Sequence, residues 1–273
     1  MDNKHKEHLE LMSHLIKDGQ AIVTIEDWEK YAPPAGKASQ WKDGRSAKEC
    51  AQAWTSANMK GRLLPPEIHK TLSTIEGFDQ VLTWTAAPEV RQAFDTLGGN
   101  TRNCDLEVRG FGRRGKFLLC IEAKADESFG KTLTKQRQSA EHARSENPKS
   151  QQLKRLNDLE TRFLKGTKFD PDKLYYQLLT ASAGALEEAK REEARYCILM
   201  IQEFISQQTD ANKRQLNHEA LNEFLSVLTK AQITVSENTL IGPIALPSHF
   251  DDSYPQFYVG LATRRLPGSG PLN

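Results

Sequence analysis

Two carboxylates and one amine near the middle of the chain have the residue types that metal-assisted hydrolysis requires. They are Asp105, Glu122 and Lys124, and all three lie within residues 105–125. Carboxylate oxygens are hard ligands that suit Mg²⁺ or Mn²⁺. Such a metal polarises a phosphate and generates hydroxide from water, and an ammonium group can stabilise the charge that develops. The three residues could therefore carry out phosphodiester hydrolysis if the fold brings them together.

A predicted β-hairpin would bring them together. Gly112 and Gly115 enclose a short basic loop between two apolar-rich runs, which indicates a hairpin turn. Pairing Phe111 with Lys116 and counting outward places Asp105 opposite Glu122. The lysine two residues beyond Glu122 lies on the same face, because side chains alternate along a strand. A one-residue bulge would break this register.

These residues resemble the motif of the PD-(D/E)XK nuclease superfamily. Asp105 is followed by Glu122-Ala123-Lys124 at the end of an apolar strand, although Cys104 stands where the motif has proline. Over about residues 70–205 the expected elements also resemble the superfamily's α-β-β-β-α-β core. The resemblance implies an α/β, restriction-endonuclease-like fold with a mixed central sheet flanked by helices. It also implies a nuclease dependent on Mg²⁺ or Mn²⁺, with DNA as the expected substrate.

The resemblance suggests further site residues on two predicted helices. Many members carry an acidic residue on the helix before the hairpin, and Glu89, on a helix expected at 88–97, is preferred over Glu76 as a third metal ligand. A glutamate there would also favour the helix dipole. In several branches a Gln or Tyr on the helix after the hairpin contacts DNA or the site. Gln177, with Tyr176, is the candidate here, and an ordinary helix position is the alternative.

A basic segment follows the predicted site. Residues 131–168 hold ten Lys or Arg against four Asp or Glu, an excess of six positive charges (ten minus four) in a chain of net charge +1. We expect a helical insertion with a break at 147–148. Lys131, Lys135 and Arg137 are the candidate phosphate contacts. A solvated pair of helices with no binding role is an equal alternative.

The remaining pattern predicts two regions. Residues 1–62 form a helical N-terminal appendage, and residues 63–273 form the nuclease-like domain. The apolar run 196–202 predicts a strand buried on both faces and parallel to 116–125. The other expected elements are helices at 4–18, 46–57, 66–73, 173–191 and 217–231, and strands at 21–25, 240–246 and 256–262.

Composition limits the class of protein. The 273 residues are 38% hydrophobic and 27% charged, which indicates a polar globular protein. The net charge of +1 indicates that the surface as a whole is not strongly basic. The four cysteines have no zinc spacing, and there is no signal-peptide or membrane-spanning run. We therefore expect a cytoplasmic protein without membrane contact. The sequence does not decide whether the protein forms a homodimer.

Two other functions compete with the nuclease. Residues 110–115 match GxGxxG, but a nucleotide-binding loop must lead into a helix, and this one leads into a predicted strand. The stronger alternative is a nuclease-fold protein without activity that binds nucleic acid or protein. The presence of Asp105, Glu122 and Lys124 together favours catalysis.

Overall fold

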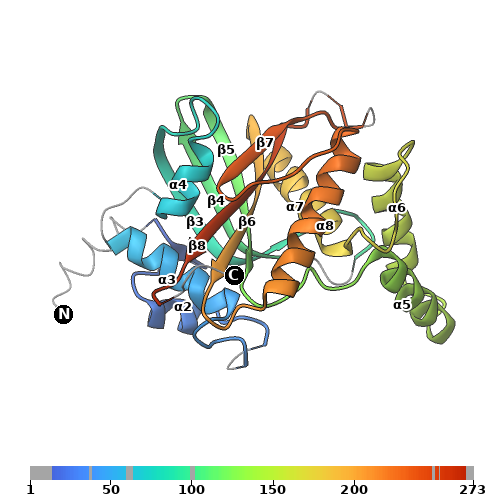
Figure 1. Ribbon diagram of the computed structural model, residues 1–273, viewed down its shortest axis with the longest axis horizontal. Helices are drawn as coiled ribbons and strands as arrows, with labels where there is room; N and C mark the ends of the chain where they lie inside the picture. The colour runs from blue at the N-terminus through green and yellow to red at the C-terminus, as the bar shows by residue number, and fades with distance from the viewer. Residues whose placement is uncertain are drawn as a thin grey trace.

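A mixed six-stranded sheet with helices on both faces forms the molecule (Figure 1). The computed structural model describes residues 14–36, 39–59, 64–98, 102–247, 250–251 and 253–268. The strands are β1 (Ile16–Lys17), β2 (Gln20–Ala21), β3 (Val81–Gln92), β4 (Arg102–Gly112), β5 (Gly115–Lys124), β6 (Tyr196–Ile205), β7 (Thr239–Ile244) and β8 (Gln256–Arg265). The helices are α2 (Ile25–Tyr31), α3 (Ser46–Met59), α4 (Pro66–Leu72), α5 (Leu133–Glu146), α6 (Gln152–Leu164), α7 (Tyr176–Arg191) and α8 (Ala211–Thr229).

The strand order is β3-β4-β5-β6-β8-β7. The first three strands are antiparallel, β6 is parallel to both β5 and β8, and β7 closes the far edge antiparallel to β8. The predicted α/β class with a mixed central sheet is thus confirmed. Every residue of β6 is buried, as its continuous apolar run predicts for a central strand.

Each face of the sheet has its own hydrophobic core. One core contains side chains of α6, α7 and α8, and we call this side of the sheet the α7 face. The other contains side chains of α2, α3 and α4, and we call it the α3 face. Trp54 of α3 is fully buried, and its indole N–H donates a 3.0 Å hydrogen bond to the Gln202 amide oxygen of β6. The described part of the predicted appendage therefore covers one side of the sheet.

The predicted hairpin forms in the predicted register from the turn as far as Leu106, and the expected pair of Asp105 with Glu122 is not among the β4–β5 pairs. Phe111 pairs with Lys116, and the pairing continues to Leu106 with Ile121. Gly112 and Gly115 also pair, which leaves a two-residue turn between them. Gly115 has a φ of 116°, a backbone conformation that a side chain would strain.

The predicted helix at 88–97 is wrong, because residues 81–92 form strand β3. Pro88 and the spacing of the apolar residues after it indicated a helix. β3, however, is an edge strand, where proline is tolerated because no partner needs its missing N–H. At the N-terminus, residues 4–13 of another predicted helix lie outside the described residues, and Ile16–Lys17 at its end pairs with Gln20–Ala21 as a small hairpin.

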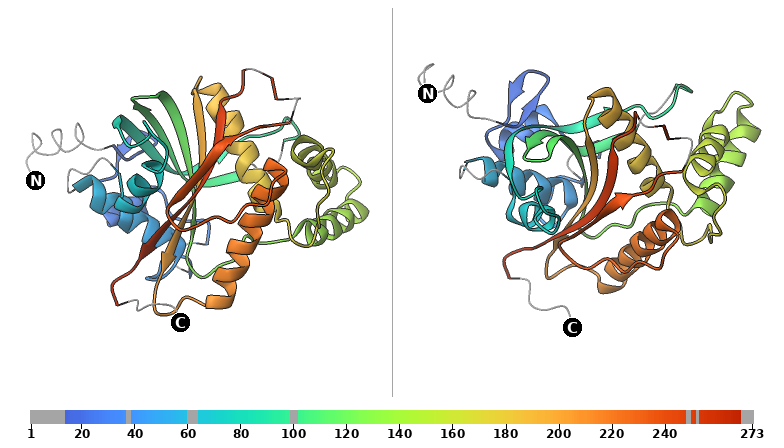
Figure 2. Two further views of the ribbon diagram at one scale, coloured as in Figure 1. Left: turned by 45° about the horizontal axis from the view of Figure 1, so that its top comes forward. Right: turned by 90° about the horizontal axis from the view of Figure 1, so that it is seen from above.

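Two helices, α5 and α6, form in the segment predicted to be a helical insertion. α5 and α6 pack against each other, with the break at Asn147, and α6 also contacts α7 and α8. Figures 1 and 2 show the pair at the opposite end of the molecule from α2 and α3, projecting beyond the sheet. The other predicted helices and the two C-terminal strands form, although α8 begins at Ala211 rather than at 217. The strand predicted at 21–25 is wrong beyond Ala21, because Ile25 begins helix α2.

Candidate active site

Asp105 and the end of β5 are joined directly. The backbone N–H of Ala123 donates a 2.7 Å hydrogen bond to the Asp105 carboxylate. Ala123 stands between Glu122 and Lys124, so the bond fixes Asp105 beside both of these residues. The hairpin therefore brings together the three residues that the sequence predicts.

The sheet is irregular at Asp105. Cys104 belongs to the core on the α7 face and Leu106 to the core on the α3 face, although residues two apart in a regular strand share a face. Across from Asp105, Glu89 interrupts the β3–β4 pairing and has a positive φ of 52°. Lys17 donates to the backbone oxygen of Glu89 at 2.9 Å. The irregularity turns Glu89 and Asp105 toward one cleft.

Glu122 is held by three side chains. Its carboxylate accepts hydrogen bonds from Lys124 at 3.0 Å, from Gln177 of α7 at 2.6 Å and from Arg102 of β4 at 2.7 Å. Glu122, Lys124 and Arg102 are all buried, with 3%, 5% and 8% of their surfaces exposed. A buried carboxylate that is held in this way keeps one orientation.

The carboxylates of the site differ in how easily they ionise. Burial would raise the pKa of Glu122, but the charges of Lys124 and Arg102 outweigh it and hold this pKa below its ordinary value. The pKa of Asp105 is raised well above its ordinary value by burial and then by the charge of Glu122. Burial also raises the pKa of Glu89, which the bond from Asn103 offsets in part. A cation bound between Asp105 and Glu122 would reduce the repulsion between their two carboxylates.

These side chains line a cleft of about 510 Å³. Glu89, Asp105, Glu122 and Lys124 line it together with residues before and at the start of α3. Among the latter, Arg45 is exposed and forms no ion pair within the described part of the chain. Lys48, one turn further along α3, is instead paired with Asp43 at 2.8 Å. The N-terminal segment thus brings one available cation to the site.

The donor set suits magnesium in kind. Within the described residues no group of three or more His, Cys, Asp or Glu side chains is arranged to hold a metal ion. Mg²⁺ is commonly bound by one or two carboxylates, with water and substrate phosphate completing its shell. Asp105 and Glu122 match that pattern, whereas Glu89 lines the cleft with its carboxylate bonded to Asn103.

The predicted nucleic-acid contacts fall into three groups. Gln177 contacts the site through Glu122. Lys131 and Lys135 lie near the start of α5, where Lys131 donates to Ser139 at 2.8 Å and Lys135 is exposed. Arg137 instead joins α5 to α6, because it bonds to Glu160 and, at 2.9 Å, to Asn157. Its guanidinium is occupied within the insertion.

Sequence reasoning missed Arg102. Besides Glu122, Arg102 donates at 2.7 Å to the amide oxygen of Gln92, whose own amide N–H donates at 2.7 Å to Glu107. A polar chain thus runs from the site along the α7 face. The only signal in the sequence is a charged residue shortly before an apolar strand, and that pattern is common at strand ends.

The comparisons with known proteins give a family but no activity. Residues 21–264 match the family described as a domain of unknown function (DUF6946), so the chain belongs to that family. No curated protein and no solved structure matches it. Separately, none of the helices in the described ranges has both the length and the apolar character that crossing a membrane requires.

Proposed function

We propose that this protein is a metal-dependent nuclease of the PD-(D/E)XK type, and that DNA is its substrate. The observation that carries the proposal is the convergence of Asp105, Glu122 and Lys124 in one cleft, with Asp105 bonded to the backbone between the other two. The chain order α4-β3-β4-β5-α7-β6, interrupted by α5 and α6, supports the proposal because it follows the expected core order.

In this proposal Asp105 and Glu122 hold Mg²⁺ or Mn²⁺. When bound, the metal activates water and polarises the phosphate. Lys124, whose pKa is raised because Glu122 and Asp105 outweigh the effect of burial, stays charged and stabilises the developing negative charge. Gln177 and Arg102 orient Glu122. Arg45 at the cleft wall contacts a phosphate of the substrate.

The proposal is tested by incubating the full-length protein with double-stranded DNA, single-stranded DNA and RNA, each with Mg²⁺, with Mn²⁺ or with EDTA. We expect metal-dependent cleavage of at least one DNA substrate and none in EDTA. Cleavage of RNA alone would change the proposed substrate from DNA to RNA and would support the same metal-dependent hydrolysis. Intact substrates throughout would contradict the nuclease.

A second candidate is a nuclease-fold protein that binds nucleic acid without cutting it. Cations contact both oxygens of the Glu122 carboxylate, since Lys124 bonds to one and Arg102 to the other. A metal would have to compete with them. Metal-independent DNA binding together with an inactive cleft would favour this candidate.

A further inference from the structure

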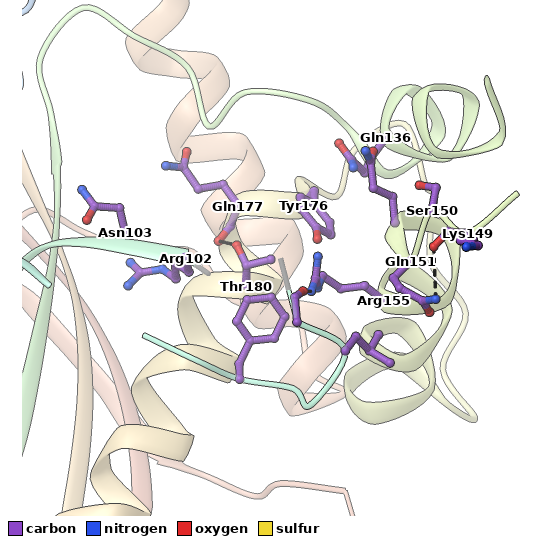
Figure 3. Close-up of a pocket in the computed structure, with 14 residues that line it drawn as sticks. Arg102, Asn103, Gln136, Lys149, Ser150, Gln151, Arg155, Tyr176, Gln177 and Thr180 are labelled. Atoms are coloured by element: carbon purple, nitrogen blue, oxygen red, sulfur yellow. Dashed lines mark hydrogen bonds between the residues drawn. The ribbon is translucent and has the colours of Figure 1, made fainter. Parts of the chain in front are cut away.

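A second and larger pocket opens beside the candidate active site. Its volume is about 820 Å³, and it lies between the insertion helices and the start of α7. Figure 3 shows Gln136 and Gln151 on the insertion side, Arg102 and Asn103 on the sheet side, and Tyr176 with Gln177 between them. This volume is within the roughly 300–1,000 Å³ of small-ligand sites.

The two pockets meet. Asn103 and Gln177 line both. In the active-site cleft Gln177 donates to Glu122 and Asn103 to Glu89, so these two amides form the boundary between the pockets. A nucleic-acid strand that lies in the active-site cleft can therefore continue past these amides into the larger pocket.

The lining of this pocket differs in chemistry from that of the active-site cleft. Among the described residues it has five side-chain amides, three hydroxyl groups, three cationic side chains and no carboxylate. The amides belong to Asn103, Gln136, Gln151, Gln152 and Gln177. Amide groups both donate and accept hydrogen bonds, as base edges require, and the absence of carboxylates suits an anionic ligand.

Two of these amides are available to a ligand. Gln136 of α5 and Gln152 of α6 form no side-chain hydrogen bond to the rest of the described chain. Another part of the lining is fixed, because Arg155 of α6 is bonded to Asp95 and, at 2.6 Å, to the backbone oxygen of Gly98. Tyr176 adds an aromatic side chain on which a base can stack.

From these observations we propose that this pocket binds one unpaired nucleotide of the strand being cut. The nucleotide's base is recognised by the amides of the insertion and packs against Tyr176. A base inside a duplex cannot enter this pocket without leaving the stack, so only an unpaired or extruded base can be bound in this way. The proposal rests on the proposed nuclease function and adds that the substrate is single-stranded or locally unpaired at the site of cleavage.

The test measures binding rather than cleavage. A fluorescent single-stranded oligonucleotide and its duplex are titrated with the wild-type protein in EDTA, which prevents metal-dependent cleavage, and with a variant that carries Gln136→Ala and Gln152→Ala; the wild type is the parent in this comparison. We expect the parent to prefer the single strand, and the double change to weaken single-strand binding about three- to tenfold, as the loss of one or two hydrogen bonds predicts. Duplex binding should stay constant. Gln138→Ala, an exposed glutamine of α5 outside the pocket, is the matched control.

The outcomes separate this inference from the nuclease proposal. A parent with no single-strand preference, or a double variant that binds the single strand as the parent does, overturns the nucleotide pocket even if the wild-type protein cleaves DNA. Equal weakening of single-strand and duplex binding also overturns it, because that result indicates only general backbone contact. If the pocket binds the single strand as expected but the wild-type protein never cleaves DNA, the nucleotide-pocket inference is supported and the nuclease proposal is contradicted.

Discussion

Arg102 and Glu122 form a buried ion pair, 2.7 Å long, between neighbouring strands at the centre of the candidate site. Removing one partner of such a pair leaves the other charge buried without compensation, which is far more costly than removing an exposed ion pair. The pair therefore links the stability of the fold to the geometry of the site.

Replacing Arg102 tests this link. Arg102→Ala should lower the free energy of unfolding by about 3 kcal/mol, because Glu122 loses a buried partner and Gln92 loses a hydrogen bond. Arg102→Lys should recover part of the loss, since it keeps the charge. Urea denaturation of the three proteins gives the comparison. Equal stability of Arg102→Ala and wild type would show that this ion pair does not support the fold.

A second buried carboxylate gives a pH-dependent prediction. Glu203 of β6 bonds to Arg214 and His218 of α8, and these bonds outweigh burial and hold its pKa below the ordinary value of 4.5. A group whose pKa is depressed by folding stabilises the fold above its unfolded pKa and loses that contribution as the pH falls through the folded pKa. Glu203→Gln should therefore cost about 1.5–3 kcal/mol at pH 7 and progressively less below about pH 4.5.

The measurement is denaturant unfolding of wild type and Glu203→Gln at a series of pH values. The gap between the two curves should narrow on acidification. A gap that stays constant from neutral to acid pH would mean that Glu203 acts through packing alone.

Arg45 is the available cation at the wall of the cleft. Arg45→Ala should weaken DNA binding about three- to tenfold, because the variant cannot form a charge-assisted hydrogen bond to phosphate. Lys48→Ala removes the same charge from the same helix end, but Lys48 is paired with Asp43, so the effect should be smaller. Fluorescence anisotropy measures the DNA affinity of both variants and shows which substitution weakens binding more. Equal effects would assign the change to general electrostatics.

The basic insertion gives a salt-dependent prediction. Replacing Lys131 and Lys135 by Ala should flatten the log–log salt dependence of DNA binding by roughly 0.9 for each phosphate that is no longer neutralised, or about two in total. Sequence preference should not change, because binding to phosphate carries no base information. Lys154, paired with Asp158 on α6, is the control. A salt plot of the double variant that overlays on wild type would make the insertion a solvated surface.

Local sequence rules predicted the centre of the site because the tight turn fixes the hairpin register. Once Phe111 pairs with Lys116, counting gives the pairs as far as Leu106 with Ile121, next to Asp105 and Glu122. Counting could not give the irregularity at Asp105, where the carboxylate accepts a hydrogen bond from the Ala123 N–H. The helical character of the insertion was also predictable, because α6 has an amphipathic pattern with one apolar face that must be buried.

Tertiary context decided what the sequence could not. Pro88 favours a helix start as strongly as an edge strand, and only the neighbouring strand β4 settles which one forms. Arg102 is polar among polar neighbours, so nothing local shows that it is buried against Glu122. The pocket beside the site depends on how the insertion packs on α7, which no local pattern encodes.

The most direct test of the nuclease is single-turnover DNA cleavage by wild type, Glu122→Gln and Lys124→Met in Mg²⁺, with Glu203→Gln as a buried-carboxylate control outside the cleft. Each variant is first shown to be folded by circular dichroism. We expect wild type and the control to cleave, and the two site variants to be slower by at least about 100-fold, as the loss of a charge-stabilising group predicts. Cleavage by Glu122→Gln at the wild-type rate, or no cleavage by wild type, would contradict a metal-dependent nuclease built on Asp105, Glu122 and Lys124.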